Sequence, residues 1–365
     1  MELATMTVSG SRTPALDAAD VARFQEQGYL VVRGVLDEAD FVPVRREYDE
    51  LLRERVRTWR AKGLFSGGED HGGLPFQEHL RRLVELPGFP LTLLAELDIT
   101  LPHMPFSFIQ DDSEFHVGPG VLSLLQNPKV LDVVECILGS EINASPNQHC
   151  RIKLPAREVQ QFGGRKGETI YAPTLWHQDA MGQLPQSNET TVLTVWIPTT
   201  DVDEENGCLA VVGGEHNDDT LLPWPMDAAL IDRLERNSIP LPVKFGDIVL
   251  LHKKAPHGSR LNKTAQVRWS FDFRYYPAHQ PTDRPWFPNI RVRSKADPGS
   301  AVVDAGAWRK SWEDARAMLA GQKLPLPGRR EFAQVVADGM IRRWEAGEYP
   351  SFPVKDVAAA STPAA

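Results

Sequence analysis

The sequence predicts a mainly β protein with surrounding α-helices, in a single domain over residues 16–354. Two observations predict this class. Between residues 141 and 280, short runs of alternating apolar and polar residues are separated by Gly, Pro, Asn and Asp, which is typical of strands joined by turns. The flanking regions instead carry longer amphipathic segments. The 29 prolines and 27 glycines among 365 residues indicate many irregular connections.

The N-terminal part, residues 16–140, is predicted to be helical with one strand. Asp17 is a candidate N-cap for a short helix that ends before Gly28. Asp37 opens a longer helix, and Pro128 suits the first turn of a third. The predicted elements of this part are helices over 17–28, 37–63 and 128–139, and a strand over 29–35.

The core, residues 141–280, is predicted to be antiparallel β structure with one helix over 226–237. The expected strands lie within the runs 143–155, 191–198, 207–214, 243–252 and 267–276. A C-terminal helical extension over 281–354 follows, with helices over 305–319 and 330–347. The small, polar ends, 1–15 and 355–365, are predicted to be flexible tails.

Composition narrows the class of partner. The net charge of −9 disfavours nucleic acid and anionic membranes, since both need a basic face. Three widely spaced cysteines make no disulfide framework, and no signal peptide or long apolar span is visible. We expect a cytoplasmic protein that acts on a small-molecule substrate, as a monomer or a homodimer.

The stretch "WHQDA" carries a candidate metal site. In an extended strand His177 and Asp179 point to the same face, so an imidazole and a carboxylate lie side by side. His257, eighty positions later and just after an apolar run, is the candidate third ligand. Two histidines and one carboxylate leave three coordination positions open, as in non-haem Fe(II) oxygenases.

The run "RWSFDFRYY" has two different faces. Arg268, Ser270, Asp272, Arg274 and Tyr276 alternate with four aromatic residues. The aromatic face must be buried. The polar face either meets solvent or points into a barrel, where an arginine can hold a carboxylate through a bidentate fork, and the pattern does not choose between these alternatives.

Several ordered runs together resemble the phytanoyl-CoA dioxygenase family of Fe(II)- and 2-oxoglutarate-dependent oxygenases. They are "WHQD", "VWIPTTDVDEENGCLAVVGGEH" and "GDIVLLHKKAPHGSRLNKTAQVRWSFDFRY". The resemblance covers residues 141–277, and the opening at 17–62 is also similar. It implies a double-stranded β-helix, a jelly-roll or cupin-like core, that binds Fe(II) at one end and uses 2-oxoglutarate and O2 as co-substrates.

The resemblance implies roles for seven residues. His177, Asp179 and His257 match the catalytic iron ligands. Arg268 matches the arginine that grips the distal carboxylate of 2-oxoglutarate, while Ser259 and Trp196 match positions lining its pocket. Lys153 loosely matches a family Lys-Pro motif. The sequence departs from the family's Pro-Gly-Ser-His turn, which here ends at His216.

Other polar residues near the motifs have simpler interpretations. His216 and His252 are expected to be structural, and His149 has only a minor chance of facing the pocket. Gln178 should face away from the iron and act as support or entrance lining. The acidic run 201–205 is expected to be a solvated loop before a turn.

Hydroxylation of an unactivated C–H bond, or desaturation or cyclisation, is the expected reaction, with release of succinate and CO2. Asp179 favours it because halogenating relatives carry a small residue there. The substrate is expected to be a small metabolite or natural-product intermediate, CoA-bound or free. Candidate walls are 63–75, 106–116, 157–173 and the residues around the ligand motif, Gln178 and 181–183.

Three alternatives remain. A metal-dependent oxygenase or isomerase without 2-oxoglutarate would keep the ligands but have no use for Arg268. A catalytically inactive small-molecule-binding barrel is the second. A zinc hydrolase is the least favoured, because no His-Glu-x-x-His helix is present.

Overall fold

The computed structural model describes residues 16–68, 71–99, 109–157, 173–184, 187–218, 220–223, 226–301 and 303–320. Both predicted tails, the predicted helix over 330–347 and nearly all of the candidate wall 157–173 lie outside the described residues. Across the described ranges, no helix combines the length and hydrophobicity needed to span a bilayer.

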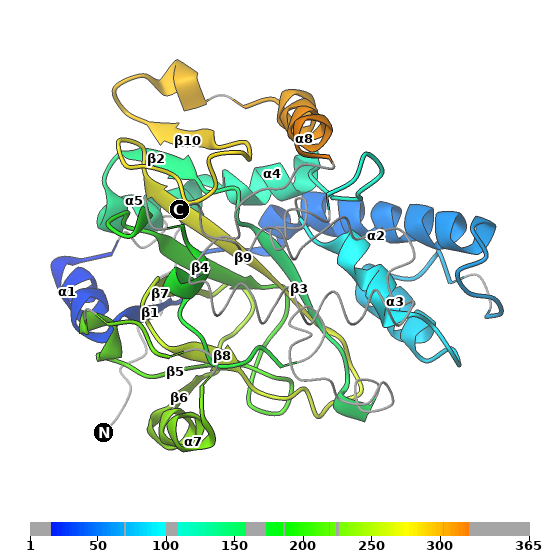
Figure 1. The fold of residues 1–365 in the computed structure, drawn as a ribbon, viewed down its shortest axis with the longest axis horizontal. Coiled ribbons are helices and arrows are strands. Elements are labelled where there is room, and N and C mark those ends of the chain that lie inside the picture. The colour runs from blue at the N-terminus through cyan, green and yellow to red at the C-terminus, as the bar shows by residue number, and fades with distance from the viewer. Residues whose placement is uncertain are drawn as a thin grey trace, which may run out of the picture.

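Two antiparallel sheets form the centre of the described chain (Figure 1). The seven-stranded sheet has the order β1-β7-β4-β9-β2-β10, with β3 also paired to β9. Its strands are β1 Tyr29–Val32, β2 Glu141–Ala144, β3 His149–Lys153, β4 Leu193–Pro198, β7 Ile248–His252, β9 Arg268–Pro277 and β10 Ile290–Ser294. The three-stranded sheet, in the order β6-β5-β8, contains β5 Leu209–Val211, β6 Ile239–Leu241 and β8 His257–Ser259.

The two sheets face each other. Trp196 of β4 and Leu251 of β7 share a buried cluster with Leu209 and Val211 of β5. Two packed antiparallel sheets with polar residues at one end of the space between them are the predicted jelly-roll core. The mainly β fold class is therefore confirmed.

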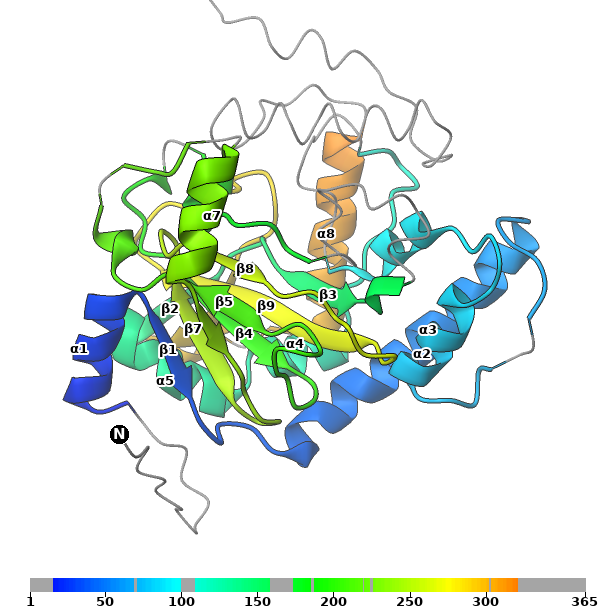
Figure 2. The same cartoon turned by 90° about the horizontal axis from the view of Figure 1, so that it is seen from below.

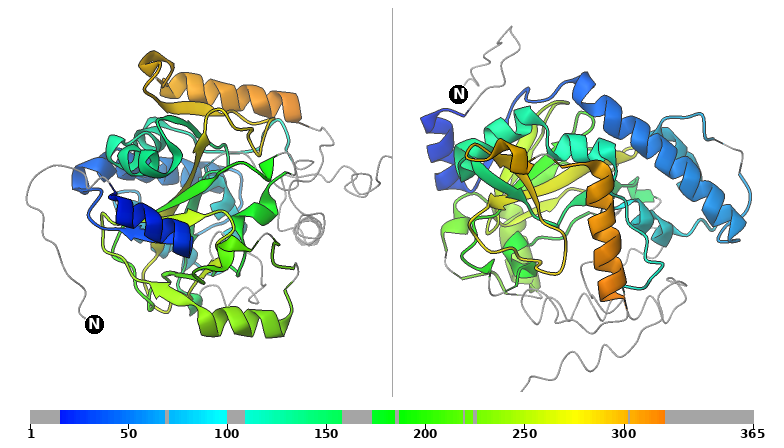
Figure 3. Two further views of the ribbon diagram at one scale, coloured as in Figure 1. Left: turned by 90° about the vertical axis from the view of Figure 1, so that its left-hand side faces the viewer. Right: turned by 90° about the horizontal axis from the view of Figure 1, so that it is seen from above.

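Helices cover both outer sides of the sheets (Figure 2). Leu234 of α7 packs on the small sheet through Ala210 and Val212, while α2, α4 and α5 lie on the far side of the large sheet. α8 packs beside α4 (Figure 3). The helices are α1 Ala18–Gln27, α2 Glu38–Ala61, α3 Phe76–Val84, α4 Pro119–Leu125, α5 Pro128–Leu138, α7 Ala228–Asn237 and α8 Ala305–Leu319. Short 3-10 helices are η1 Leu91–Leu97, η3 Asp179–Gly182, η5 Glu215–Asn217 and η6 Pro298–Ala301.

The predicted helix starts are confirmed by their caps. The Asp17 carboxylate accepts the backbone N–H of Asp20, and Gly28 ends α1 at a φ of 75°. Asp37 caps α2 in a capping box with Asp40. These signals are local, since a cap and the turn it closes lie within a few residues.

The aromatic face of β9 is buried against the N-terminal helices. The ring of Trp269 lies 5.0 Å from that of Tyr48 on α2 and 4.6 Å from that of Phe76 on α3. The hydroxyl of Tyr275 donates to the Leu125 carbonyl of α4 at 2.8 Å. The helices therefore occupy the outer side of β9 and leave its polar face to the space between the sheets.

The polar face of β9 points into the molecule, not into solvent. Arg268 is 2% exposed, Arg274 is 4% exposed, and Ser270 is fully buried. This decides between the two interpretations left open by the alternating pattern. Buried arginines need partners, and the site supplies them.

The sheet extends beyond the predicted core. β1 pairs with β7, and β10 pairs with β2, so strands from both flanking parts join the large sheet. The predicted C-terminal helical extension over 281–354 did not include a strand, and β10 lies within it. Its five residues form a strand because β2 lies beside them, and that neighbour, about 150 residues earlier in the chain, leaves no local signal.

Candidate active site

His177 and His257 are joined by their backbones before their side chains meet. The N–H of His177 donates to the carbonyl of His257 at 3.0 Å, and the reverse bond measures 2.9 Å. This reciprocal pair places the segment before His177 alongside β8. The two imidazole rings lie with their centroids 4.2 Å apart.

Both imidazoles are held in the same tautomer. Nδ1 of His177 lies 2.9 Å from the Leu175 carbonyl oxygen, and Nδ1 of His257 lies 2.9 Å from that of Ala255. A carbonyl only accepts, so each Nδ1 carries a proton, and Nε2 is the nitrogen left for a metal in the neutral ring. Burial lowers the pKa of His257 to about 4, so this ring is neutral at physiological pH. Nε2 is therefore the nitrogen that each ring can offer to a metal.

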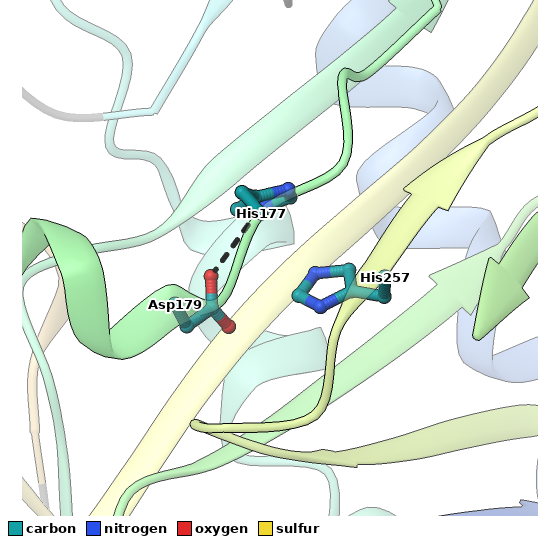
Figure 4. A group of neighbouring side chains, drawn as sticks. All are labelled: His177, Asp179 and His257. Atoms are coloured by element: carbon teal, nitrogen blue, oxygen red, sulfur yellow. Dashed lines mark ion pairs between the residues drawn. The ribbon is translucent and has the colours of Figure 1, made fainter. Parts of the chain in front are cut away.

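Asp179 completes a three-ligand cluster. Its Oδ1 lies 3.7 Å from Nε2 of His177, and ligand atoms of Asp179 and both histidines lie within 4.8 Å of one another. Figure 4 shows the three side chains converging on one point. In the part of the chain that the structure describes, this is the only such cluster of three.

The prediction that His177 and Asp179 lie in a regular strand is wrong. His177 lies in an isolated β-bridge, and Asp179 begins the 3-10 helix η3. Gln178 between them has φ −117° and ψ 131°, which is extended backbone. One extended residue preserves the two-residue alternation, so the side chains still share a face.

Two residues that the sequence patterns did not assign to the site hold the Asp179 carboxylate. Thr194 Oγ1 donates to Oδ2 at 2.6 Å, and Arg274 Nη2 donates to Oδ1 at 2.8 Å. Burial acts to raise the pKa of Asp179, but the charge of Arg274 outweighs it and holds this pKa well below its usual range. Arg274 was recognisable only as part of the polar face of β9, and Thr194 carried no signal.

A cavity between the sheets contains the two histidines. It is narrow, with a volume of about 20 Å³, which is room for about one water molecule. Its walls come from both sheets and from the segment before His177. The lining residues are Arg151, Lys153, Thr174, His177, Thr194, Trp196, Leu209, Leu251, His257, Gly258, Arg268 and Asp272.

Arg268 lies in this cavity with donors to spare. Its Nη1 donates to Ser270 Oγ at 2.8 Å, its Nη2 donates to the Gly207 carbonyl at 3.0 Å, and its Cζ stands 5.4 Å over the Trp196 ring. Burial lowers its pKa to about 10, so it stays charged at neutral pH. Its buried Nε has no hydrogen-bond partner among the described residues. A buried cation with an orphaned N–H fits an anionic group from outside the chain.

The other residues carried over from the family pattern lie close by. Trp196 lines the cavity and donates its indole N–H to Ser270. Lys153 lines it too, and its ammonium donates to Thr174 Oγ1 at 2.8 Å. Ser259 is in β8, where its hydroxyl accepts the N–H of Thr174, and it is not among the lining residues.

The cavity is rich in positive charge. Arg151 joins Lys153 and Arg268 in its wall, and Asp272 pairs with Arg151 at 2.9 Å. Burial, followed by the charge of Arg268, lowers the pKa of Lys153 well below its usual range. An anionic group bound in this cavity would offset the repulsion between Lys153 and Arg268.

Gln178 acts as support. Its side chain is buried and bridges the Lys254 carbonyl and the Leu222 N–H, at 2.7 and 2.8 Å. Entrance lining is not supported for Met181, which is fully buried in the core. His149 pairs with Asp98 at 2.9 Å and is not among the residues that line the cavity.

His216 and His252 are structural, as expected. Their rings pack edge to face with centroids 4.9 Å apart, and His216 Nε2 lies 3.0 Å from the Gln25 carbonyl oxygen. This contact joins η5 to α1. Neither residue lines the cavity that contains His177 and His257.

The chain should lose stability in mild acid through His252. Burial, followed by His216, lowers the pKa of His252 to about 4 from 6.5. Between these values the unfolded chain binds a proton that the folded chain does not, so stability present above pH 6.5 is lost as the pH falls. Urea unfolding at pH 7 and 5 should show a loss of up to about 2 kcal/mol from this residue. His252→Asn should reduce the loss, and an unchanged difference between the two pH values would contradict the assignment.

The family model and the relatives that match this chain all indicate the same family. The chain matches the family described as phytanoyl-CoA dioxygenase (PhyH) over residues 24–270. It is 26% identical over 268 residues to phytanoyl-CoA dioxygenase domain-containing protein 1 of Danio rerio, covering 70% of this chain and 88% of that protein. It is 25% identical to the peroxisomal phytanoyl-CoA dioxygenase of Mus musculus, covering 67% of this chain but only 64% of that enzyme.

Two solved structures are among those that are similar to this chain. The α-ketoglutarate-dependent carbocyclase SnoK from nogalamycin biosynthesis matches with a TM-score of 0.42 and 19% identity, over 81% of this chain and 94% of that chain. HygX from Streptomyces hygroscopicus, with nickel and 2-oxoglutarate bound, matches with a TM-score of 0.42 and 15% identity, over 74% of this chain and 90% of that chain.

Proposed function

Because this chain belongs to the phytanoyl-CoA dioxygenase family of Fe(II)- and 2-oxoglutarate-dependent oxygenases, we propose that it oxidises an unactivated C–H bond of a small organic metabolite. Hydroxylation is the favoured outcome, and desaturation or cyclisation shares its first step. The iron ligands in this proposal are His177, Asp179 and His257. Arg268 is the proposed anchor of 2-oxoglutarate.

The observation that carries the proposal is convergence on one cavity. The cluster of two imidazoles and a carboxylate lies at the same cavity as a buried arginine with an unpaired N–H. The donor set fits Fe(II), since it offers two imidazole nitrogens and one carboxylate oxygen. A co-substrate with a carboxylate at one end and a chelating keto acid at the other would engage Arg268 and the metal together, since Arg268 and both histidines line this cavity.

Fe(II) with 2-oxoglutarate and O2 supplies the oxidising chemistry, and 2-oxoglutarate leaves as succinate and CO2. The chain contributes position and charge. The backbone acceptors behind His177 and His257 keep both rings in the ligand tautomer. Trp196 and Leu251 form an apolar part of the cavity wall.

The substrate class in this proposal is a small, partly polar metabolite or natural-product intermediate. The retained carboxylate of Asp179 supports oxygen insertion over halogenation, because it leaves no place for a halide ligand. The described walls of the cavity carry Arg151 and Lys153, which favour a substrate with an acidic or strongly polar group.

The test is succinate release by the purified, Fe(II)-loaded chain. We expect slow oxygen-dependent conversion of 2-oxoglutarate to succinate without substrate, and faster conversion when a screened metabolite is accepted. Iron binding without any consumption of 2-oxoglutarate would favour an oxygenase or isomerase that does not use it. Failure to bind Fe(II) at micromolar concentration would favour the alternative that the protein is a catalytically inactive small-molecule-binding barrel.

A further inference from the structure

We propose that Arg274 and Thr194 form an anion cradle that positions the Asp179 carboxylate as a ligand through one oxygen. The inference rests on the proposed function, since it gives Arg274 a role at the iron site. Arg274 is a positioning residue in this proposal, because it contacts the carboxylate and is not among the cavity-lining residues.

The register of the sheet builds the cradle. Thr194 of β4 lies directly opposite Arg274 of β9, so the hydroxyl and the guanidinium rise from paired positions. Asp179 reaches this pair from η3, which is tied to the loop after β7 by the bond from the Ala180 N–H to the Lys253 carbonyl. The side chains of Arg274 and Asp179 are both buried, at 5% and 6% exposed.

The two carboxylate oxygens have different partners. Oδ2 accepts Thr194 Oγ1 at 2.6 Å and Arg274 Nε at 3.4 Å, on the side of the sheet. Oδ1 accepts Arg274 Nη2 at 2.8 Å and faces Nε2 of His177 at 3.7 Å. With Oδ2 occupied, one oxygen is offered toward the histidines, and the remaining coordination positions stay open for 2-oxoglutarate and O2.

Arg274 is itself held in place by the connection between β2 and β3. Its Nη1 donates to the Asn147 carbonyl at 3.1 Å, and its backbone N–H donates to the Gln148 side chain at 3.0 Å. Its carbonyl accepts the Ser145 N–H at 2.8 Å. The arginine cannot follow a displaced carboxylate without breaking these bonds, so the cradle is a rigid template.

The first test measures metal affinity. Arg274→Met should weaken Co(II) binding to the iron-free protein by about 10- to 100-fold, measured by calorimetry. The Co(II) affinity of Arg274→Lys should lie between those of Arg274→Met and the wild type, because lysine keeps the charge but loses the two-pronged hydrogen bonding of the guanidinium. Arg55→Met is the matched control, since Arg55 forms a half-buried ion pair with Glu114 at 2.7 Å on the helical side, and it should leave Co(II) affinity unchanged.

The second test replaces the carboxylate with an added anion. Asp179→Gly should lose Co(II) binding and regain much of it when formate is added, because the cradle holds formate where the carboxylate stood. Formate should not restore binding in Asp179→Gly combined with Arg274→Met. Equal rescue of both variants would overturn the cradle, whatever the folding of either protein.

The outcomes separate this inference from the proposed function. Co(II) affinity that is unchanged in Arg274→Met, in a wild type that binds metal well, overturns the cradle alone. A wild type that binds no metal overturns both.

Discussion

Asp179→Ala is expected to abolish oxygen-dependent succinate formation. The substitution removes one of three donors from the cluster with His177 and His257. It also leaves the buried guanidinium of Arg274 without its carboxylate, and an uncompensated buried charge is costly. Loss of the ligand and repulsion of the incoming cation by Arg274 act in the same direction. We expect a rate at least about 100-fold below that of the wild type in a succinate assay at saturating Fe(II).

A surface carboxylate provides the control for this variant. Asp201→Ala removes an aspartate that pairs with Lys244 at 2.9 Å on an exposed loop, so succinate formation should be unchanged. Circular dichroism and the unfolding midpoint show whether Asp179→Ala is folded. A folded Asp179→Ala chain that still couples 2-oxoglutarate to substrate oxidation would refute the assignment of Asp179 as a ligand.

Arg268→Leu is expected to raise the KM for 2-oxoglutarate by about 100-fold while Fe(II) affinity stays near that of the wild type. The reason is the loss of the charge-assisted hydrogen bonding to the co-substrate carboxylate, which contributes about 3 kcal/mol. Arg268→Lys should keep part of the affinity through its charge. The readout is succinate formation as 2-oxoglutarate is varied, with Fe(II) affinity measured separately.

The control for Arg268 is another arginine of the same sheet. Arg291 of β10 pairs with Glu141 at 3.2 Å, away from the cavity, and Arg291→Leu should leave the KM unchanged. If Arg268→Leu also left the KM unchanged, the anchor would have to be another cation of the cavity wall, with Lys153 the first candidate.

Much of the fold was predictable wherever the signal is local. The caps at Asp17 and Asp37 and the first turn at Pro128 each lie within a few residues of the helix they begin, and all three helices are present. Elements without a strong local pattern were missed. β10 depends on its partner β2, and the short helix α4 packs on α2 so closely that Gly120 leaves no room for a side chain.

The sequence by itself determined the candidate ligands and the candidate anchor. The spacing of His177 and Asp179 has a direct chemical meaning, and the family resemblance implied the role of Arg268. Alternation along β9 put Arg268 and Arg274 on one face. The tertiary structure decided which way that face points, because only the packing of aromatic rings against α2 and α3 buries the other.

Tertiary structure alone also joined Arg274 and Thr194 to Asp179. Ninety-five residues separate Asp179 from Arg274, and fifteen separate it from Thr194. Nothing in their spacing marks them as partners. They meet because the register between β4 and β9 pairs Thr194 with Arg274, while Asp179 lies at the start of η3. Strand register is a property of the assembled sheet, not of any one segment.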